Sequence, residues 1–241
     1  MSIKISAGKF KSINIEVPNS ARPTLLKNRQ ALFNMIESLG ISENKNPFGK
    51  FFDNLTVIDC FAGSGALGIE ALSRGAAHAY FVDNDKRAVS VIKNNLAKIN
   101  AENSSTVLFG SINELEKFES VRPTHIDVAF LDPPYDTDFS SYVNNTFDKQ
   151  DQERLANYLI NKCPAKFMLV IKNTDFISEL YSDKGLYITS FDKTYMVSFK
   201  GRNNRDCEHL LITNYPIGED VKKTSNVAIL KPNKKKQLQY A

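Results

Sequence analysis

The strongest constraint on the fold is a regular alternation of strand and helix patterns between residues 56 and 172. Short apolar runs typical of buried strands are separated by segments in which apolar residues recur at helical spacing. Strands that alternate with helices of about 10 to 15 residues form a parallel sheet with helices on both faces. The sequence therefore predicts an α/β fold. The expected strands lie at 56–60, 79–83, 106–109, 127–132 and 166–172.

Further elements are expected on both sides of this alternation. Residues 3–17 alternate apolar and polar side chains around a glycine, which predicts a hairpin, and a helix with apolar residues at helical spacing follows at 25–40. Two β segments at 187–201 and 208–215 are expected to pair antiparallel at one edge. We therefore predict a mostly parallel, seven-stranded sheet with an antiparallel C-terminal edge.

These patterns suggest three parts of the chain. Residues 1–50 form an N-terminal hairpin and helix extension, 51–216 form the main α/β domain, and 217–241 form a flexible tail with a lysine run. A lysine run at a terminus is usually solvated, and an arm that contacts phosphates is the alternative.

Composition excludes several classes of protein. No apolar run reaches the roughly 18 residues that cross a bilayer, and the first residues lack a signal-peptide core, so we expect a cytoplasmic protein with no membrane partner. Three scattered cysteines and three histidines do not form a zinc or disulfide pattern, so no metal is expected. The net charge of +4 is compatible with a nucleic-acid partner.

Three glycines lie at the turn between the first of these strands and the next helix. Gly63, Gly65 and Gly68 fit the pattern G-x-G-x-x-G, and Asp83 follows Gly63 by twenty residues at the end of the next strand. Glycines at such a turn let the backbone approach a ligand, and the acid accepts hydrogen bonds from two ribose hydroxyls. The pattern therefore predicts a site for a nucleoside-containing cofactor.

The glycine pattern alone fits a dinucleotide or S-adenosylmethionine, and Asp59 favours the second. This acid lies at the end of the strand, before the loop. A carboxylate there would repel a pyrophosphate from the helix N-terminus, but it suits the charged amino group of a methionine moiety. We predict that Asp59, Gly63, Gly65 and Asp83 bind S-adenosylmethionine. NAD or FAD, and a glycine turn kept only for packing, are the alternatives.

Four neighbouring residues are further candidates for contact with the cofactor. Phe61 lies inside the glycine loop, and Asn84 follows the acid, where it would reach the ribose or the adenine edge. Ser111 and Ile112 follow the third strand, in a loop expected to line the adenine ring. Ser111 would bind the polar edge of the ring, and Ile112 would pack on its face.

A second motif, LDPPYD at 131–136, ends a later strand. Because prolines fix φ, Pro133 and Pro134 hold the backbone in one extended shape. The Asp132 side chain and a backbone carbonyl would then point at one spot, followed by the ring of Tyr135. The carboxyl ends of parallel strands share one edge of the sheet, so we expect this corner beside the sulfonium of the cofactor.

These groups suit the methylation of an exocyclic amino group on a base. Such an amine is a poor nucleophile because its lone pair is delocalised into the ring, and two acceptors on its hydrogens favour a pyramidal, more reactive nitrogen. Tyr135 would stack on a base extruded from its helix or loop. We therefore interpret Asp132, Pro133, Pro134 and Tyr135 as catalytic. A Pro-Pro turn with a capping Asp and a core Tyr is the structural alternative.

At these motifs the sequence resembles bacterial methyltransferases that modify guanine N2 in small-subunit (16S) ribosomal RNA. The resemblance covers about residues 3–136 through ISAGKFKSINIEVPNSARPTLLKNRQALFN, DCFAGSGALGIEALSRGA and FLDPPY. It implies a Rossmann-like class I methyltransferase fold with an N-terminal extension, and S-adenosylmethionine as donor. It also implies that Arg22 and Thr24 of an RPT motif lie near the cofactor and target pocket. For Arg22, a salt bridge that anchors the extension is the alternative.

The C-terminal part resembles a different group. TFDKQDQERLANYL and VSFKGRNNRDCEHLLITNY are more similar to DNA adenine-N6 methyltransferases, whose catalytic motif is also DPPY. However, only 48 residues separate Asp83 from Asp132, which leaves little room for a segment that reads base edges in a groove. An enzyme of ribosomal RNA obtains specificity from the shape of a large particle.

Three functions therefore remain open, in this order. Guanine N2 methylation of small-subunit rRNA is preferred, DNA adenine-N6 methylation is the alternative, and a non-catalytic nucleic-acid-binding protein is the third. For either enzyme, a basic turn at 200–205 would place Arg202 and Arg205 against phosphates, although a solvated hairpin turn explains them equally well.

Overall fold

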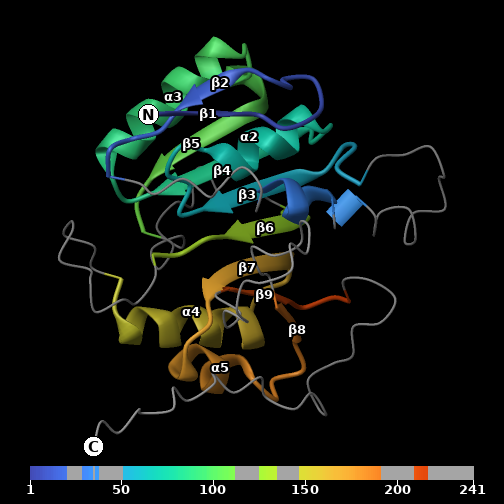
Figure 1. Cartoon of the computed structure of the whole chain (residues 1–241), viewed down its shortest axis with the longest axis vertical. Coiled ribbons are helices and arrows are strands. Elements are labelled where there is room, and N and C mark those ends of the chain that lie inside the picture. Colours follow the sequence, from blue (N-terminus) through green and yellow to red (C-terminus); the bar gives the residue numbers. More distant parts are fainter. Residues whose placement is uncertain are drawn as a thin grey trace, which may run out of the picture.

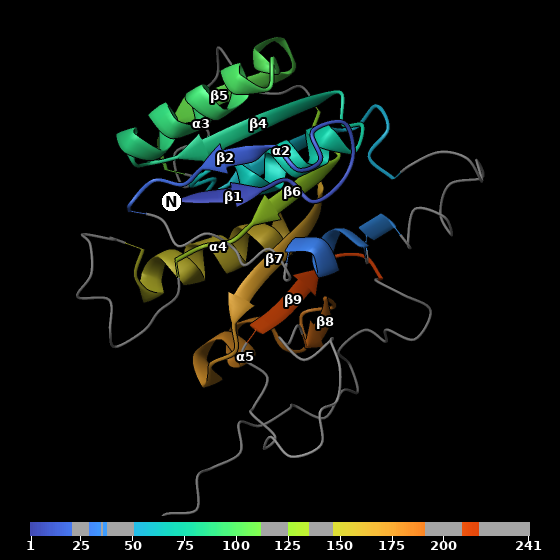
Figure 2. The ribbon, with the colours of Figure 1, turned by 45° about the horizontal axis from the view of Figure 1, so that its top comes forward.

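Seven strands within the described part of the chain form one mixed sheet, shown in Figures 1 and 2. The computed structural model describes residues 1–20, 29–34, 36–37, 51–111, 125–134, 147–190 and 209–216. The sheet order is β5 (Ser105–Phe109), β4 (His78–Asp83), β3 (Thr56–Cys60), β6 (Val128–Leu131), β7 (Lys166–Lys172), β9 (His209–Thr213) and β8 (Tyr187–Ser190). The first five strands are parallel, and β9 pairs antiparallel with both β7 and β8. The predicted sheet with an antiparallel C-terminal edge is confirmed.

The strand order reverses at β3. The chain first builds β3, β4 and β5 toward one edge and then returns to place β6 on the other side of β3. Open parallel sheets bind ligands at the carboxyl ends of their strands, at the point where the order reverses. The loops that follow β3 and β6 therefore lie where a ligand site is expected.

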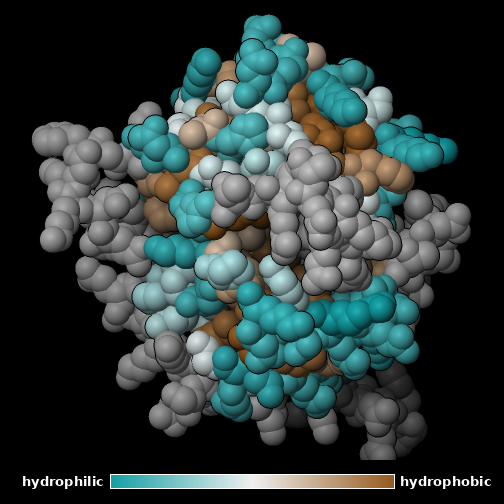
Figure 3. Space-filling model, turned by 180° about the vertical axis from the view of Figure 1, so that it is seen from behind, coloured by the Kyte–Doolittle hydropathy of each residue, from teal (hydrophilic) through white to brown (hydrophobic). Residues whose placement is uncertain are grey.

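Helices cover both faces of the sheet, as the buried central strands require. The apolar sides of α2 (Ala66–Ser73) and α3 (Lys86–Lys98) pack into one core, and those of α4 (Lys149–Asn161) and α5 (Asp175–Tyr181) pack into another. Figure 1 shows the two pairs on opposite sides of the sheet. Seen from behind in Figure 3, the described surface is mainly hydrophilic, because the apolar side chains line these two cores.

Of the four α-helices whose bounds the structure describes, α2 to α5, three begin at a side-chain cap. Asp85 accepts a hydrogen bond from the N–H of Arg87 at the start of α3, and Thr174 accepts one from the N–H of Ile177 at the start of α5. Asp148 and Asp151 form a reciprocal capping box at the start of α4. Such caps satisfy backbone donors that have no partner within the helix. Helix α2 has no cap from its own N-cap residue, Gly65.

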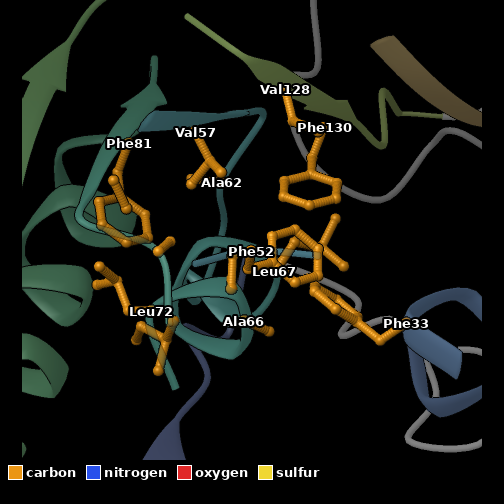
Figure 4. Close-up of a cluster of buried hydrophobic side chains, with 14 of the residues drawn as sticks. Phe33, Phe52, Val57, Ala62, Ala66, Leu67, Leu72, Phe81, Val128 and Phe130 are labelled. Atoms are coloured by element: carbon orange, nitrogen blue, oxygen red, sulfur yellow. The ribbon is translucent and has the colours of Figure 1, made fainter. Parts of the chain in front are cut away.

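The N-terminal segment shares a core with the sheet. The rings of Phe33 and Phe130 lie 5.5 Å apart between centroids, and those of Phe33 and Phe52 lie 5.3 Å apart. Figure 4 shows these three rings gathered beside α2. Residues 29–34 and 36–37 are helical, which agrees with the helix predicted there. Residue 33 thus packs directly against residues 52 and 130 of the main α/β domain. The domain boundary predicted at residue 50 stays a prediction.

The predicted N-terminal hairpin is confirmed, and its turn is fixed to the C-terminal end of α2. Its strands β1 (Ser2–Lys4) and β2 (Asn14–Glu16) pair antiparallel. The oxygen atoms of Ser73 accept hydrogen bonds from the N–H groups of Lys9 (2.7 Å) and Phe10 (2.8 Å). Gly8 has a φ of 77°, and a Cβ there would lie 1.8 Å from the Ser73 carbonyl oxygen. The approach therefore requires glycine at this position.

A buried charge cluster continues this contact. Glu70 of α2 is fully buried and accepts hydrogen bonds from Arg29 Nε (3.2 Å) and Arg74 Nε (3.1 Å). It also accepts hydrogen bonds from the N–H groups of Ser6 (2.9 Å) and Ala7 (3.1 Å). Burial lowers the pKa of Arg29, and Glu70 opposes that shift. One carboxylate thus holds the hairpin, the N-terminal helical segment and α2 together.

Candidate active site at the strand ends

Three strand ends meet at the carboxyl edge of the sheet. Cys60, the last residue of β3, pairs with Val82 on one side and with Leu131 on the other. The residues that follow these three in the chain, Phe61, Asp83 and Asp132, therefore lie at neighbouring strand ends. The register brings the glycine loop and the LDPPYD corner to the same edge, as the sequence predicts.

The loop after β3 turns sharply through left-handed backbone conformations. The φ angles of Phe61, Gly63 and Gly65 are 65°, 55° and 77°. Glycine adopts such angles at no steric cost, whereas Phe61 is under local strain. The Gly63 N–H donates a hydrogen bond to Asp83 Oδ2 (2.7 Å), and the Phe61 ring packs edge-on against Phe147 (5.1 Å). The loop is thereby fixed over the end of β4.

Asp83 is half-buried and holds the loops on both sides of it. Its Oδ1 atom accepts a hydrogen bond from the N–H of Asp85 (2.8 Å). Burial raises the pKa of Asp83, and backbone hydrogen bonds from Asp85, Gly63 and Asn84 oppose this shift. A carboxylate has about four lone-pair sites. Asp83 can therefore hold these loops and still accept a ribose hydroxyl.

Asp59 lies beneath the glycine loop, with only 1% of its surface exposed. Its Oδ2 atom accepts a hydrogen bond from the N–H of Gly68 (2.9 Å), in the first turn of α2. Asp59 thus supplies the cap that Gly65 does not provide. Burial raises the pKa of Asp59 well above its usual range, and the nearby charges of Asp132 and Asp83 raise it further. Asp59 pairs in register with Phe81 and Phe130, which precede Asp83 and Asp132 by two residues.

Two of the three glycines have a packing role. A Cβ on Gly68 would lie 2.4 Å from the Phe81 ring, and one on Gly65 would lie 3.2 Å from it. Gly68 thus lets α2 pack closely on β4. This close packing, rather than a ligand contact, explains why glycine occupies position 68. Gly63, which donates to Asp83, is the glycine most directly tied to the predicted nucleoside site.

The LDPPYD corner begins at Leu131, the last residue of β6. Leu131 and Pro133 are buried, whereas Asp132 and Pro134 are half-buried. β6 lies between β3 and β7, so neighbouring strands support the corner on both sides. Asp132 is therefore held at the site edge by a buried strand and a buried proline.

The remaining predicted site residues are only partly described. Asn84 is exposed and directly follows Asp83. Ser111 follows Gly110, whose N–H donates a hydrogen bond to the Asp83 carbonyl oxygen (2.9 Å), so Ser111 also lies at the carboxyl edge of the sheet. Their contacts with a cofactor stay predictions. Six other predicted site residues lie outside the described ranges: Arg22, Thr24, Ile112, Tyr135, Arg202 and Arg205.

The sequence interpretation missed two supporting residues. Asn95 of α3 is buried, accepts from the Glu16 N–H (2.7 Å) and donates to the Glu16 (2.9 Å) and Ser64 (3.0 Å) carbonyls. It therefore ties the hairpin to the glycine loop. Asp85 binds the Asp83 carboxylate through its N–H and accepts a hydrogen bond from Ser20. The capping position of Asp85 was a usable signal, as was the helical spacing of Asn95 with buried apolar residues.

The geometry fits S-adenosylmethionine better than a dinucleotide. A pyrophosphate at the N-terminus of α2 would meet the buried Asp59 carboxylate, which already accepts the Gly68 N–H there. A ligand with positive charge at that end would instead be stabilised by Asp59. Asp83 provides the acceptor for ribose hydroxyls one strand away. The donors and charges present therefore agree with the cofactor expected from the sequence.

Within the described ranges, no helix combines the length and apolar character needed to cross a membrane. In the same ranges, no group of three or more His, Cys, Asp or Glu side chains is placed to hold a metal ion.

The raised pKa of Asp59 leads to a testable pH dependence. An Asp with a raised folded pKa stabilises the fold below its unfolded pKa, about 4, and this contribution is lost as pH rises through the folded pKa. Asp59→Asn keeps an acceptor for Gly68 but never ionises. We expect the unfolding free energy of this variant, relative to the unaltered chain, to increase as pH rises. Urea denaturation of cofactor-free protein at several pH values measures this difference.

Asp83 titrates in both proteins, so the comparison isolates Asp59. Parallel pH profiles for the two proteins would show that Asp59 does not titrate with a raised pKa. Calorimetry should also show weaker S-adenosylmethionine binding by Asp59→Asn, because the variant cannot ionise in response to the positive charge of the bound cofactor.

Related sequences share the part of the chain that carries these motifs. The family model described as Conserved hypothetical protein 95 matches residues 3–161. The protein YlbH of Bacillus subtilis is 36% identical over 135 residues, which is 56% of this chain and 67% of that protein. Ribosomal RNA small subunit methyltransferase D of Escherichia coli is 33% identical over 135 residues, which is 55% of this chain and 60% of that protein. The match thus covers about two thirds of these relatives.

A viral type II methyltransferase is also related, over a shorter region. The type II methyltransferase M.CviBI of Paramecium bursaria Chlorella virus NC1A is 39% identical over 113 residues, which is 42% of this chain and 40% of that protein.

Solved structures share the fold. The Escherichia coli protein yhhF has a TM-score of 0.57 at 23% identity, covering 88% of this chain and 98% of that chain. The N-terminal domain of human METTL16, solved in complex with SAH, has a TM-score of 0.59 at 13% identity, covering 84% of this chain and 76% of that chain. The class I methyltransferase fold expected from the sequence is thereby confirmed.

Proposed function

Because this chain belongs to the family described as Conserved hypothetical protein 95, together with the small-subunit rRNA methyltransferases D, we propose that it methylates an exocyclic amino group of a nucleic-acid base. The specific substrate we propose is guanine N2 in small-subunit (16S) ribosomal RNA. The observation that carries this proposal is the register of β4, β3 and β6. This register places Asp83, suited to the ribose, and Asp132, suited to the amine, on either side of the glycine loop.

On the cofactor side, Asp83 would accept the ribose hydroxyls, and the left-handed backbone at Gly63 and Gly65 would allow close approach of the ligand. Asp59 would add negative charge beneath the methionine moiety. When bound, S-adenosylmethionine supplies a methyl group on a positively charged sulfur, which departs as a neutral thioether. The proposed peripheral contacts are Phe61, Asn84, Ser111 and Ile112.

On the substrate side, Asp132 and the Pro133 carbonyl would accept hydrogen bonds from the two N–H groups of the amine. These bonds orient the nitrogen lone pair toward the methyl group, and positioning of this kind supplies much of an enzymatic rate. Asp132 would also receive the proton that nitrogen loses when the new N–C bond forms. Tyr135 would stack on the extruded base, with Arg22 and Thr24 near the same pocket.

Ribosomal RNA is preferred over DNA for two reasons. The matched rRNA enzymes align over more of the chain than the type II enzyme does. In addition, the family model extends to residue 161 and so includes α4, which the sequence resemblance had associated with DNA enzymes. DNA adenine-N6 methylation stays the alternative, because M.CviBI is 39% identical over its aligned region.

Transfer of a labelled methyl group distinguishes these substrates. The purified chain is incubated with methyl-labelled S-adenosylmethionine and either small-subunit particles from cells that lack the protein or duplex DNA. Both polymers are then digested to nucleosides and analysed by mass spectrometry. We expect label in N2-methylguanosine from the particles and none in DNA.

Particles from cells that contain the protein are the matched control. Their target base is already methylated, so they should accept little label. Label in N6-methyldeoxyadenosine would establish the DNA alternative. Absence of label from both polymers, with cofactor binding intact, would support a non-catalytic binding protein.

A further inference from the structure

Helix α3 differs in charge from the other described helices. It carries four cations, Lys86, Arg87, Lys93 and Lys98, and no acid among its 13 residues. Its charge of +4 equals the net charge of the whole chain. By contrast, α4 contains two acids and two cations, α5 contains two acids and no cation, and α2 contains the single buried acid Glu70.

The four cations lie on the exposed side of α3. The opposite side, which includes Ala88, Ile92 and Leu96, is buried in the core. At 100° per residue, Lys86 and Lys93 form one row along the helix, and Arg87 and Lys98 form a second row about 100 to 140° around it. The exposed residues between the rows are Ser90, Asn94 and Ala97, which are small or uncharged. We call these cations and the surface between them the α3 face.

None of the ion pairs between described residues includes a cation of the α3 face. Lys98 donates one hydrogen bond, to the Asn14 carbonyl oxygen (2.7 Å), and its ammonium group has three donors. Among the described residues, two exposed acids adjoin α3: Glu16 on β2, whose N–H donates to Asn95 of that helix, and Glu102 in the short helix η1 (Glu102–Ser104) after it. The half-buried Asp85 caps the N-terminus of α3. Glu16 pairs with Ser2 of the neighbouring strand β1, on which the cation Lys4 is also exposed.

An exposed aromatic ring lies at the end of the α3 face nearest the active site. Phe109, the last residue of β5, has 48% of its surface exposed. The ammonium of Lys86 lies 5.5 Å from its ring centroid, and Phe109 pairs in register with Asp83. Exposed aromatic rings next to cations stack unpaired bases in proteins that bind single-stranded RNA.

We propose that the α3 face binds the phosphate backbone of the RNA substrate and that Phe109 stacks on an unpaired base beside it. This inference rests on the proposed function for the identity of the RNA. Twelve residues from Lys86 to Lys98 correspond to about 18 Å of helix, so the face spans several successive phosphates. Its Lys86 end lies next to Asp83, so the bound strand is directed toward the catalytic edge.

Charge reversal tests the α3 face. Arg87→Glu with Lys93→Glu leaves the buried side of α3 unchanged, and an acid in the first turn suits the helix dipole. The matched control is Lys162→Glu with Lys184→Glu, two exposed cations after α4 and α5 with the same total change in charge. Binding of small-subunit particles from cells lacking the protein is measured as a function of KCl concentration, without cofactor. S-adenosylmethionine affinity confirms that each variant is folded.

We expect the α3 reversal to weaken particle binding at least about tenfold and to reduce the slope of log K against log [KCl] by about 1.5, because roughly 0.7 to 0.9 is lost per phosphate contact. The control pair should change both quantities much less. Phe109→Ala should weaken binding by about tenfold, the scale of one stacked base, with an unchanged slope. Equal effects of the α3 and control reversals, or no particle binding by the unaltered chain, would overturn the inference.

The outcome is separable from that of the proposed function. Methyl transfer to particles by the unaltered chain, with α3 and control variants binding alike, would leave the proposed function standing and exclude the α3 face. Loss of binding only in the α3 variant, with no transfer by the unaltered chain, would support the α3 face as the RNA contact and contradict the proposed methyl transfer.

Discussion

Asp132→Asn is expected to lower the rate of methyl transfer by at least about a hundredfold, the scale of losing one preorganised hydrogen-bonding group at a reaction centre. The amide keeps one acceptor but lacks the charge that draws the proton from the amine. Asp132 lies beyond the end of a buried strand, so the change should leave the fold intact. Single-turnover transfer to small-subunit particles measures the rate, and calorimetry measures cofactor affinity, which should change by no more than about threefold.

Asp183→Asn is the matched control, because it makes the same chemical change in an exposed turn after α5. Asp183 has a φ of 56°, a conformation that Asn tolerates well. This variant should retain full activity. Equal activity of the Asp132 and Asp183 variants would remove Asp132 from the catalytic residues. A large loss of cofactor affinity in Asp132→Asn would instead assign it to the cofactor site.

Replacement of Glu70 by Ala is expected to lower the free energy of unfolding by about 3 to 5 kcal/mol, the usual cost of breaking a buried ion pair on one side. Arg29 is fully buried and Arg74 is 3% exposed. Both would lose the carboxylate that accepts their hydrogen bonds. For a chain of this size the change corresponds to a fall in Tm of about 10 °C. Thermal and urea denaturation measure it.

Glu37→Ala provides the contrast. Glu37 forms an ion pair with the same Arg74 side chain (2.8 Å), but its own side chain is 36% exposed. Solvent screens such a pair, and its loss should cost about 1 kcal/mol or less. If the two variants were equally stable, the cluster at Glu70 would not hold the N-terminal segment in place.

The order of strands and helices was predictable from the sequence because it depends on local patterns. Apolar runs and helical spacing predicted β3 at 56–60 and β7 at 166–172, the bounds that the structure gives. The rule that ligands bind at the carboxyl ends of parallel strands then placed Asp83 and the LDPPYD corner at one edge. Neither step requires knowledge of which distant residues touch.

The supporting contacts were not predictable, because they join residues far apart in the sequence. Glu70 binds Ser6, which is 64 positions away, and Asn95 binds Glu16, which is 79 positions away. No local pattern indicates which partner a buried polar side chain will have. The role of Gly68 was also not predictable from the sequence. A cofactor-binding motif and a close contact with Phe81 both require glycine, so the residue type alone does not distinguish them.

The contacts made by Asn95 and Asp85 connect the N-terminal segment to the cofactor site. Asn95 joins β2 to the Ser64 carbonyl of the glycine loop, and Asp85 joins Ser20 to the loop that follows Asp83. The RPT motif begins two residues after Ser20. The segment that leads to this motif is therefore fixed to the same loops that would hold the cofactor.

The most direct test of the central claim is a crystal structure of the chain with S-adenosylmethionine bound. The claim is that the glycine loop after β3 and the corner after β6 form one methyl-transfer site. We predict that the ribose hydroxyls lie on Asp83 and that the methyl group points toward Asp132, leaving room for an amine at the roughly 3 to 3.5 Å of a reactive contact. A cofactor bound elsewhere, or one whose methyl group points away from Asp132, would contradict the claim.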